Sequence, residues 1–95
     1  MTAFRRTPIA HHRTLVASGA QLVDVREPDE VADGMLAGAV NIPLGELPLS
    51  IGRLDRTRTV ALVCRSGNRS ATAAQMLVEA GFRDVVNLEG GMSAL

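Results

Sequence analysis

Residues 59–81 constrain the fold most, because a strand, a short polar turn and a helix follow one another there without a gap. Residues 59–63 are β-branched or aliphatic, which predicts a buried strand. Residues 70–80 have the composition of a helix, and Gly81 is a typical helix stop. Such a strand–turn–helix unit is typical of an α/β domain.

Strands and helices alternate along the rest of the chain as well. Further strands are predicted at residues 3–5, 21–25, 38–43 and 84–88. Helices are predicted at residues 7–19, with Thr7 as N-cap and Pro8 in the first helical position, and at residues 28–33. Residues 44–54 contain Pro48 and are predicted to form a loop and one interrupted helix. The alternation predicts an α/β domain with a small, mostly parallel sheet.

Length and charge narrow the class of protein. The 95 residues are enough for one domain, with a core that must be aliphatic because only two residues are aromatic. Ten basic and ten acidic residues cancel, so neither nucleic acid nor a membrane is expected as a partner. No apolar run approaches the ~18–20 residues of a membrane span, and the first six residues lack the apolar core of a signal peptide. A cytoplasmic protein is therefore expected.

The single cysteine, Cys64, excludes an intrachain disulfide and any metal site with several cysteines. His11 and His12 are adjacent on a predicted helix and have no third ligand at a useful spacing. We therefore expect neither a metal nor another cofactor.

Cys64 lies where the predicted strand gives way to the turn. Unpaired backbone N–H groups and the positive end of the following helix favour the thiolate form at such a position. The alternative is a small buried apolar residue, since free cysteines are among the most buried residues. The polar residues that follow Cys64 favour the reactive thiolate.

Residues 65–69 predict an anion-binding loop. If the loop curls, its backbone N–H groups point inward and surround an anion. Gly67 permits the positive φ that such a curl requires, and Asn68 tolerates it. Arg69 has a guanidinium group that can bind an oxyanion through two hydrogen bonds and also brace the loop.

Several motifs in this chain resemble those of a single-domain rhodanese, which is a sulfurtransferase. They are LVDVREP at residues 22–28, GAVNIPL at 38–44, VCRSGNRS at 63–70, AGF at 80–82 and NLEGGM at 87–92. Because these motifs occur in order and span about residues 7–95, the resemblance implies one rhodanese-like domain over residues 1–95. The implied fold has three layers, with helices on both faces of the sheet.

The resemblance also implies a mechanism. Cys64 attacks the outer sulfur of thiosulfate or a related small anionic donor, releases sulfite, and passes the sulfur from its persulfide to cyanide or a thiol. Substrate binding is implied for the loop residues Arg65, Ser66, Gly67, Asn68 and Arg69. Asp24 and Arg26 are expected to brace the loop by ion pairing, with a plain surface salt bridge as the alternative.

Two features of the chain refine this resemblance. Four residues separate Cys64 from Arg69, as in the sulfurtransferases of the family, whereas the related phosphatases have five. Met35-Leu36 stands where the family often has His-Ile, and Ser93-Ala94-Leu95 stands where it usually continues into a C-terminal helix. The C-terminal helix of the family is therefore expected to be shortened or missing.

Other functions remain open at this point. One is a sulfur relay, in which a protein thiol is the true acceptor and activity with thiosulfate is incidental. Another is a phosphatase-like or purely binding domain that uses the anion-binding loop without sulfur chemistry. The presence of Cys64 weakens the binding-only alternative, and the loop length weakens the phosphatase.

Overall fold

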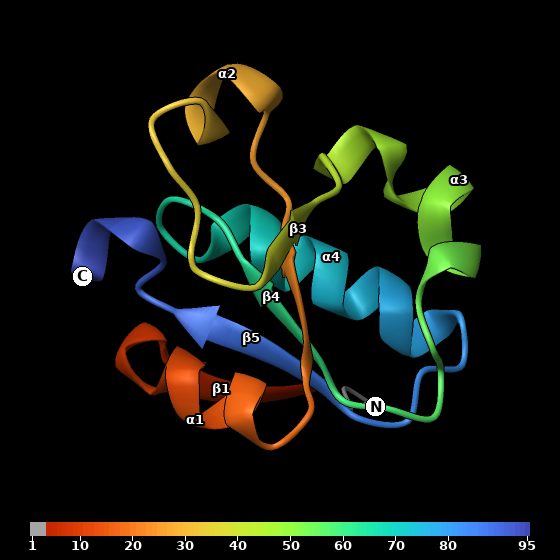
Figure 1. Ribbon diagram of the computed structural model, residues 1–95. Helices are drawn as coiled ribbons and strands as arrows, with labels where there is room; N and C mark the ends of the chain where they lie inside the picture. The colour runs from red at the N-terminus through yellow and green to blue at the C-terminus, as the bar shows by residue number, and fades with distance from the viewer. Residues whose placement is uncertain (1–3) are drawn as a thin grey trace.

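A computed structural model describes residues 4–95, and its centre is a five-stranded sheet in the order β1-β5-β4-β2-β3 (Figure 1). All neighbouring strands pair in parallel. The strands are β1 (Phe4–Pro8), β2 (Gln21–Asp24), β3 (Ala39–Asn41), β4 (Val60–Val63) and β5 (Val85–Glu89). The prediction of an α/β domain with a small parallel sheet is confirmed.

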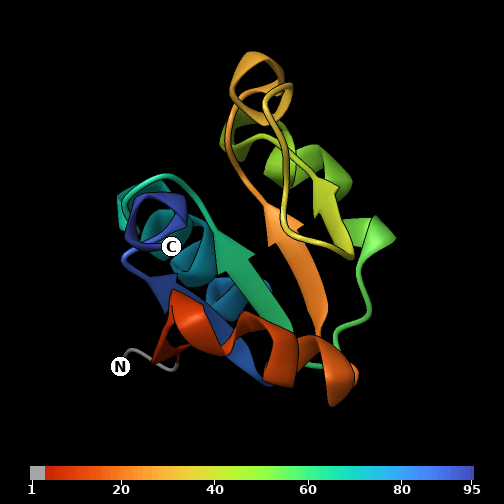
Figure 2. The ribbon, with the colours of Figure 1, turned by 60° about the vertical axis from the view of Figure 1, so that its left-hand side comes forward.

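Helices cover both faces of this sheet (Figures 1 and 2). The α-helices are α1 (His12–Ala17), α2 (Pro28–Val31), α3 (Leu47–Ser50) and α4 (Asn68–Glu79). Short 3-10 turns lie at Ile9–His11, Leu44–Glu46, Ile51–Arg53 and Met92–Ala94. The three-layer arrangement that the resemblance implied is therefore present. None of the helices in residues 4–95 has the length and apolar character needed to cross a membrane.

Two apolar clusters, one on each face, hold the layers together. On the face covered by α4, Leu62 and Val85 pack with Leu77 of the helix and with Leu47 of α3. The other cluster contains the residues Ile9, Leu22, Leu36, Ala61, Val63, Val86 and Leu88, packed against Leu15 and Val16 of α1. Both faces of β4 are buried, which is why this strand is apolar along its whole length.

The predicted helix at residues 7–19 is wrong in its first part. Thr7 and Pro8 lie in β1, which pairs with β5 from Phe4 opposite Val85 to Pro8 opposite Glu89. Because β1 is an edge strand, Pro8 at its end can lack a backbone N–H without breaking the ladder. Helix α1 begins only at His12. The edge strand expected at residues 3–5 is present from Phe4 onward, and Ala3 lies outside the described residues.

Other boundaries differ by a few residues. Helix α4 begins at Asn68, because Gly67 takes a left-handed conformation, with φ of 100°, and forms its N-cap. Residues 44–54 contain α3 between two 3-10 turns, an interruption that Pro48 in the first turn of α3 accounts for. In α2, Glu27 and Glu30 form a reciprocal capping box around Pro28.

Candidate active site

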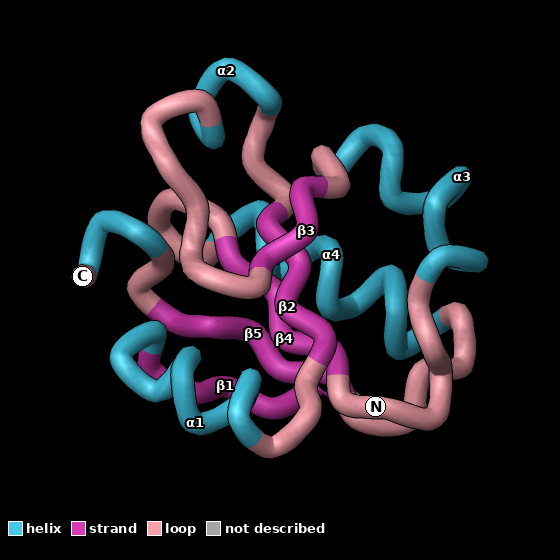
Figure 3. Tube along the Cα trace, viewed as in Figure 1, coloured by secondary structure: helices cyan, strands magenta, loops and turns pink. Residues whose placement is uncertain are grey.

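The loop between β4 and α4 places Cys64 at the carboxyl end of a central strand. Ligand sites in open parallel sheets lie at this edge. Strands β2 and β5 end at the same edge of the sheet as β4. The segments that follow them, α2 and the turn after β5, therefore flank the loop (Figure 3). Three stretches that are far apart in the sequence therefore meet at the loop that holds Cys64.

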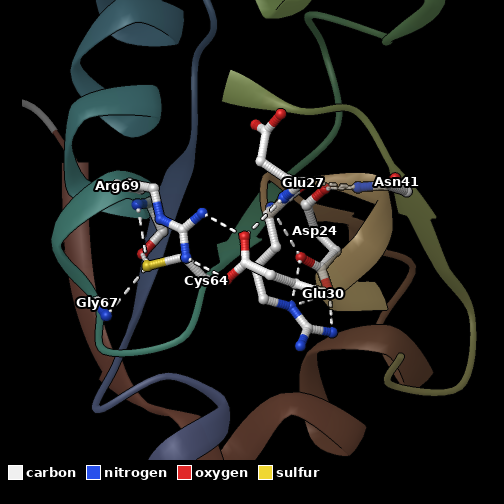
Figure 4. Close-up of polar contacts among 9 residues, drawn as sticks. Asp24, Glu27, Glu30, Asn41, Cys64, Gly67 and Arg69 are labelled. Atoms are coloured by element: carbon white, nitrogen blue, oxygen red, sulfur yellow. Dashed lines mark hydrogen bonds and ion pairs between the residues drawn. The ribbon is translucent and has the colours of Figure 1, made fainter. Parts of the chain in front are cut away.

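Backbone N–H groups of the loop point at the Cys64 sulfur (Figure 4). Sγ accepts hydrogen bonds from the Gly67 N–H at 3.1 Å and from the Ser70 N–H at 3.3 Å. The positive φ of Gly67 turns its N–H inward, which a residue with a Cβ could adopt only with strain. Of the N–H groups at residues 65–69 that were expected to point inward, that of Gly67 bonds to the sulfur, and the second donor, Ser70, lies one residue beyond this range.

Cys64 combines two properties that the sequence analysis treated as alternatives. It is only 1% exposed and belongs to an apolar cluster, as a structural cysteine would. Burial raises the pKa of its thiol, but hydrogen bonds from the Ser70 side chain and from the backbone N–H groups of Ser70, Gly67 and Ser66 outweigh it. The pKa of Cys64 therefore lies below its ordinary value. A cysteine with a lowered pKa is a candidate nucleophile.

Arg69 is bound to a carboxylate that the sequence analysis did not single out. Its two terminal nitrogens donate to the Glu30 carboxylate at 2.7 and 2.8 Å (Figure 4). The Arg69 guanidinium and the Glu27 N–H, in that order, lower the pKa of Glu30 to about 2. Glu30 also accepts from the Glu27 N–H at 2.9 Å. No local sequence pattern indicated its pairing with Arg69, which lies 39 residues away.

Asp24 and Arg26 pair with each other rather than with the Cys64 loop. The Arg26 side chain donates to both Asp24 carboxylate oxygens at 2.8–3.1 Å, and both residues are buried. Arg26 also donates to the Gly34 carbonyl at 2.8 Å, which fixes the segment before β3. Within residues 4–95 neither side chain bonds to residues 64–70, and the ion pair that reaches this loop directly is Glu30–Arg69.

The turn after β5 binds the backbone at the start of the loop, a contact that was not predicted from the sequence. The N–H groups of Met92 and Ser93 donate to the carbonyls of Cys64 and Arg65, each at 2.9 Å. Gly91 lies so close that a Cβ there would collide with the same two carbonyl oxygens. The glycines of the NLEGGM motif were a signal for such a close approach of backbone.

The remaining predicted loop residues lie around the sulfur without bonding to it through their side chains. Arg65, Ser66 and Asn68 are exposed, whereas Gly67 is buried. In the part of the chain that the structure describes, no three His, Cys, Asp or Glu side chains gather as ligands for a metal ion. The loop offers backbone donors, arginine and one thiol, which suits covalent chemistry with an anion.

The family profile described as rhodanese-like domain matches residues 10–95. The chain belongs to the rhodanese-like family. A sulfurtransferase of Allochromatium vinosum is 40% identical to it over 77% of this chain and 68% of the relative. The thiosulfate sulfurtransferase GlpE of Stutzerimonas stutzeri is 34% identical over 96% of this chain and 84% of the relative. The resemblance drawn from the motifs is therefore confirmed.

Solved structures agree with this rhodanese-like assignment. The crystal structure of a rhodanese-like domain protein from Staphylococcus aureus superimposes with a TM-score of 0.86 at 30% identity. The match covers 95% of this chain and 89% of the other. The similarity thus extends over the sheet, both helical layers and the loop that holds Cys64.

Proposed function

We propose that this rhodanese-like domain is a thiosulfate sulfurtransferase that works through a persulfide on Cys64. The observation that carries this function is the position of the Cys64 sulfur. It lies inside a loop of inward-pointing N–H groups at the carboxyl end of β4, and its pKa is lowered there. Two of the relatives above bear the names sulfurtransferase and thiosulfate sulfurtransferase, which supports the same activity.

The first half-reaction makes one bond and breaks one. The Cys64 thiolate attacks the outer sulfur of thiosulfate, the bond between the two thiosulfate sulfurs breaks, and sulfite leaves with its electron pair. The negative charge then lies on the outer sulfur of the persulfide. In the second half-reaction cyanide or a thiolate attacks that sulfur, and the Cys64 thiolate is released without a net change in charge.

The loop is suited to this chemistry because charge stays on sulfur throughout. N–H donors that are already oriented stabilise the thiolate without reorganisation during the reaction. Arg65 and Arg69 supply positive charge for the doubly charged donor, although Arg69 must share its guanidinium with Glu30. We place the donor on the side of the loop where Arg69 lies, since a guanidinium group can bind an oxyanion through two hydrogen bonds.

The acceptor is cyanide, a small thiol or the thiol of a partner protein. The outer sulfur of a persulfide reaches further from the backbone than Sγ does, which brings it nearer to an acceptor than the buried thiol. A reducing compartment such as the cytoplasm suits the domain, because Cys64 must be free to react. Turnover with each acceptor class separates an enzyme for small molecules from a relay, since a relay prefers the protein thiol.

Intact mass spectrometry tests the persulfide directly. After incubation with thiosulfate, the protein should gain the mass of one sulfur atom, and cyanide should remove it. Cys64→Ser should gain nothing, because the chain has no other cysteine. If the wild-type protein gains no sulfur from thiosulfate or any other sulfane donor, the proposed function is wrong.

A further inference from the structure

The Ser70 hydroxyl group lies between the Cys64 thiol, which donates to it, and the Asn87 amide oxygen, to which it donates. Its oxygen is 3.3 Å from the Cys64 sulfur and 2.6 Å from Oδ1 of Asn87, which comes from β5. Ser70 is fully buried and Asn87 is 4% exposed, so this short chain of polar groups is shielded from bulk water. A hydroxyl group has one proton, which can be donated to the sulfur or to the amide oxygen but not to both.

The orientation of the Asn87 amide is fixed by a second contact. Its Nδ2 donates to the Gly67 carbonyl oxygen at 3.3 Å, and a carbonyl can only accept. The amide oxygen must therefore face Ser70. Asn87 thus contacts both ends of the loop, the N-cap of α4 at Gly67 and the first turn of that helix at Ser70.

We propose that Asn87 is a positioning residue for sulfur transfer. Its amide oxygen accepts the hydrogen bond of the Ser70 hydroxyl group whenever the Cys64 sulfur carries no negative charge. In the thiol, Cys64 donates to Ser70 and Ser70 donates to Asn87. In the thiolate, the Ser70 proton turns to the sulfur, which has become the stronger acceptor. In the persulfide the charge lies on the outer sulfur, and the Ser70 proton returns to Asn87.

Other groups near Cys64 do not perform this exchange. The Arg69 guanidinium of α4 is paired with the Glu30 carboxylate of α2. At the end of β2, the side chains of Asp24 and Arg26 form an ion pair with each other. The backbone N–H groups that bond to the sulfur donate in every state. The Ser70 hydroxyl is thus the donor whose partner changes, and Asn87 is the group that competes for it.

The two residues should therefore have opposite effects on the acidity of Cys64. Ser70→Ala removes a donor to the thiolate, so the pKa of Cys64 should rise and the thiolate fraction at a pH below it should fall about tenfold. In Asn87→Leu the leucine side chain is similar in shape to asparagine but cannot accept a hydrogen bond from Ser70. The Ser70 hydroxyl group is then free to donate to the thiolate, so the pKa of Cys64 should fall. The double variant should match Ser70→Ala, because Asn87 acts through Ser70.

Titration of the thiolate by its ultraviolet absorbance measures this pKa without any reagent. The chain has one cysteine and neither Trp nor Tyr, so no other side chain obscures the signal. Thr72→Ala removes an exposed hydroxyl group from the same helix and should leave the pKa unchanged. If the leucine packs badly, Asn87→Ala removes the same acceptor. It should lower the pKa of Cys64 by less than Asn87→Leu, because water in a hollow of about 230 Å³ beside Asn87 then partly replaces the acceptor.

The proposal is overturned if Asn87→Leu raises the pKa of Cys64, or if its effect persists unchanged when Ser70 is already alanine. Either result would mean that Asn87 does not act by competing for the Ser70 proton. The inference rests on the proposed function only in treating Cys64 as the reacting sulfur. The titration needs no sulfur donor, so its failure is distinguishable from a failure to form the persulfide. With thiosulfate, Ser70→Ala should slow persulfide formation about tenfold at a pH below the pKa of Cys64.

Discussion

Two arginine–aspartate pairs in this domain have similar geometry but very different surroundings. Arg26 and Asp24 are buried at the end of β2, with side chains 8% and 0% exposed. Arg5 and Asp84 form an equally close two-bonded pair at 2.9 Å, with side chains 55% and 40% exposed. Water competes for the second pair and not for the first, so burial should decide what each pair contributes to stability.

Arg26→Met tests this difference at the residue scale. The substitution leaves the Asp24 carboxylate buried without its partner and the Gly34 carbonyl without its donor. The free energy of unfolding should therefore fall by about 3–5 kcal/mol. Arg5→Met, the matched control, should cost no more than about 1 kcal/mol. Denaturant unfolding of both variants measures the two free energies.

A second variant separates charge from packing at this position. Asp24→Asn combined with Arg26→Met removes both charges, so it should recover part of the stability that Arg26→Met loses. Equal costs for Arg26→Met and Arg5→Met would show that burial at the end of β2 does not matter. Because Arg26 is placed outside the reacting loop, Cys64 should still form a persulfide in any variant that folds.

At the scale of elements, the turn after β5 acts as a support for the reactive loop. Gly91 has φ of 59° and ψ of −165°, a region that is almost closed to residues with a Cβ. Its two following N–H groups hold the Cys64 and Arg65 carbonyls. The loop between β4 and α4 therefore takes its shape partly from the turn after β5, which comes later in the sequence than both α4 and β5.

Gly91→Ala should break this support. Backbone strain and the collision with two carbonyl oxygens together should destabilise the fold by about 3 kcal/mol. Any protein that still folds should form the Cys64 persulfide more slowly, because the loop must move to make room. Denaturant unfolding and the rate of mass gain with thiosulfate measure the two effects.

Gly52→Ala is the control for this prediction. Gly52 lies in a 3-10 turn, has no positive φ, and has open space where the methyl group would be. That variant should form the persulfide at the wild-type rate. Its free energy of unfolding should equal that of the wild-type protein or be slightly higher, because alanine makes the unfolded chain less flexible. If Gly91→Ala behaves like Gly52→Ala, the turn after β5 does not shape the loop.

At the scale of the whole molecule, local signals could be predicted from the sequence, and contacts between distant segments could not. The run at residues 59–63, the turn and the helix lie next to one another in the chain, so Cys64 could be placed at a strand end. The pairing of Arg69 with Glu30 joins residues 39 apart, and that of Asn87 with Gly67 joins residues 20 apart. No local pattern specifies which side chains the sheet will bring together.

Thr7 and Pro8 show why a local signal can also mislead. The pair is typical of a helix start, and Pro8 does lie immediately before the 3-10 turn Ile9–His11. The same residues also suit the end of an edge strand, and pairing of β1 with β5 decided between the two. Asp24 and Arg26 were expected to brace the reactive loop by ion pairing, and the structure shows that they pair with each other and that Arg26 also donates to the Gly34 carbonyl.

The ion pair between Glu30 and Arg69 links α2 to α4 across the active edge of the sheet, so its protonation should affect the stability of the whole domain. The pKa of Glu30 is lowered to about 2 in the folded protein, from an unfolded value near 4.5. A lowered pKa stabilises the fold above the unfolded value, and the gain is lost as the pH falls through the folded value. The relevant window is therefore from about pH 4.5 down to about pH 2.

Glu30→Gln has no carboxylate to lose in this window. Its melting temperature should lie below that of the wild-type protein at pH 7, and the gap should close as the pH falls toward 2. Glu79→Gln, on an exposed part of α4, is the control and should melt like the wild-type protein throughout. A gap that stays constant from pH 7 to pH 2 would mean that the Glu30 side chain acts through its shape and not its charge. Because the substitution also frees the Arg69 guanidinium, the KM for thiosulfate should fall when α2 and α4 remain in place.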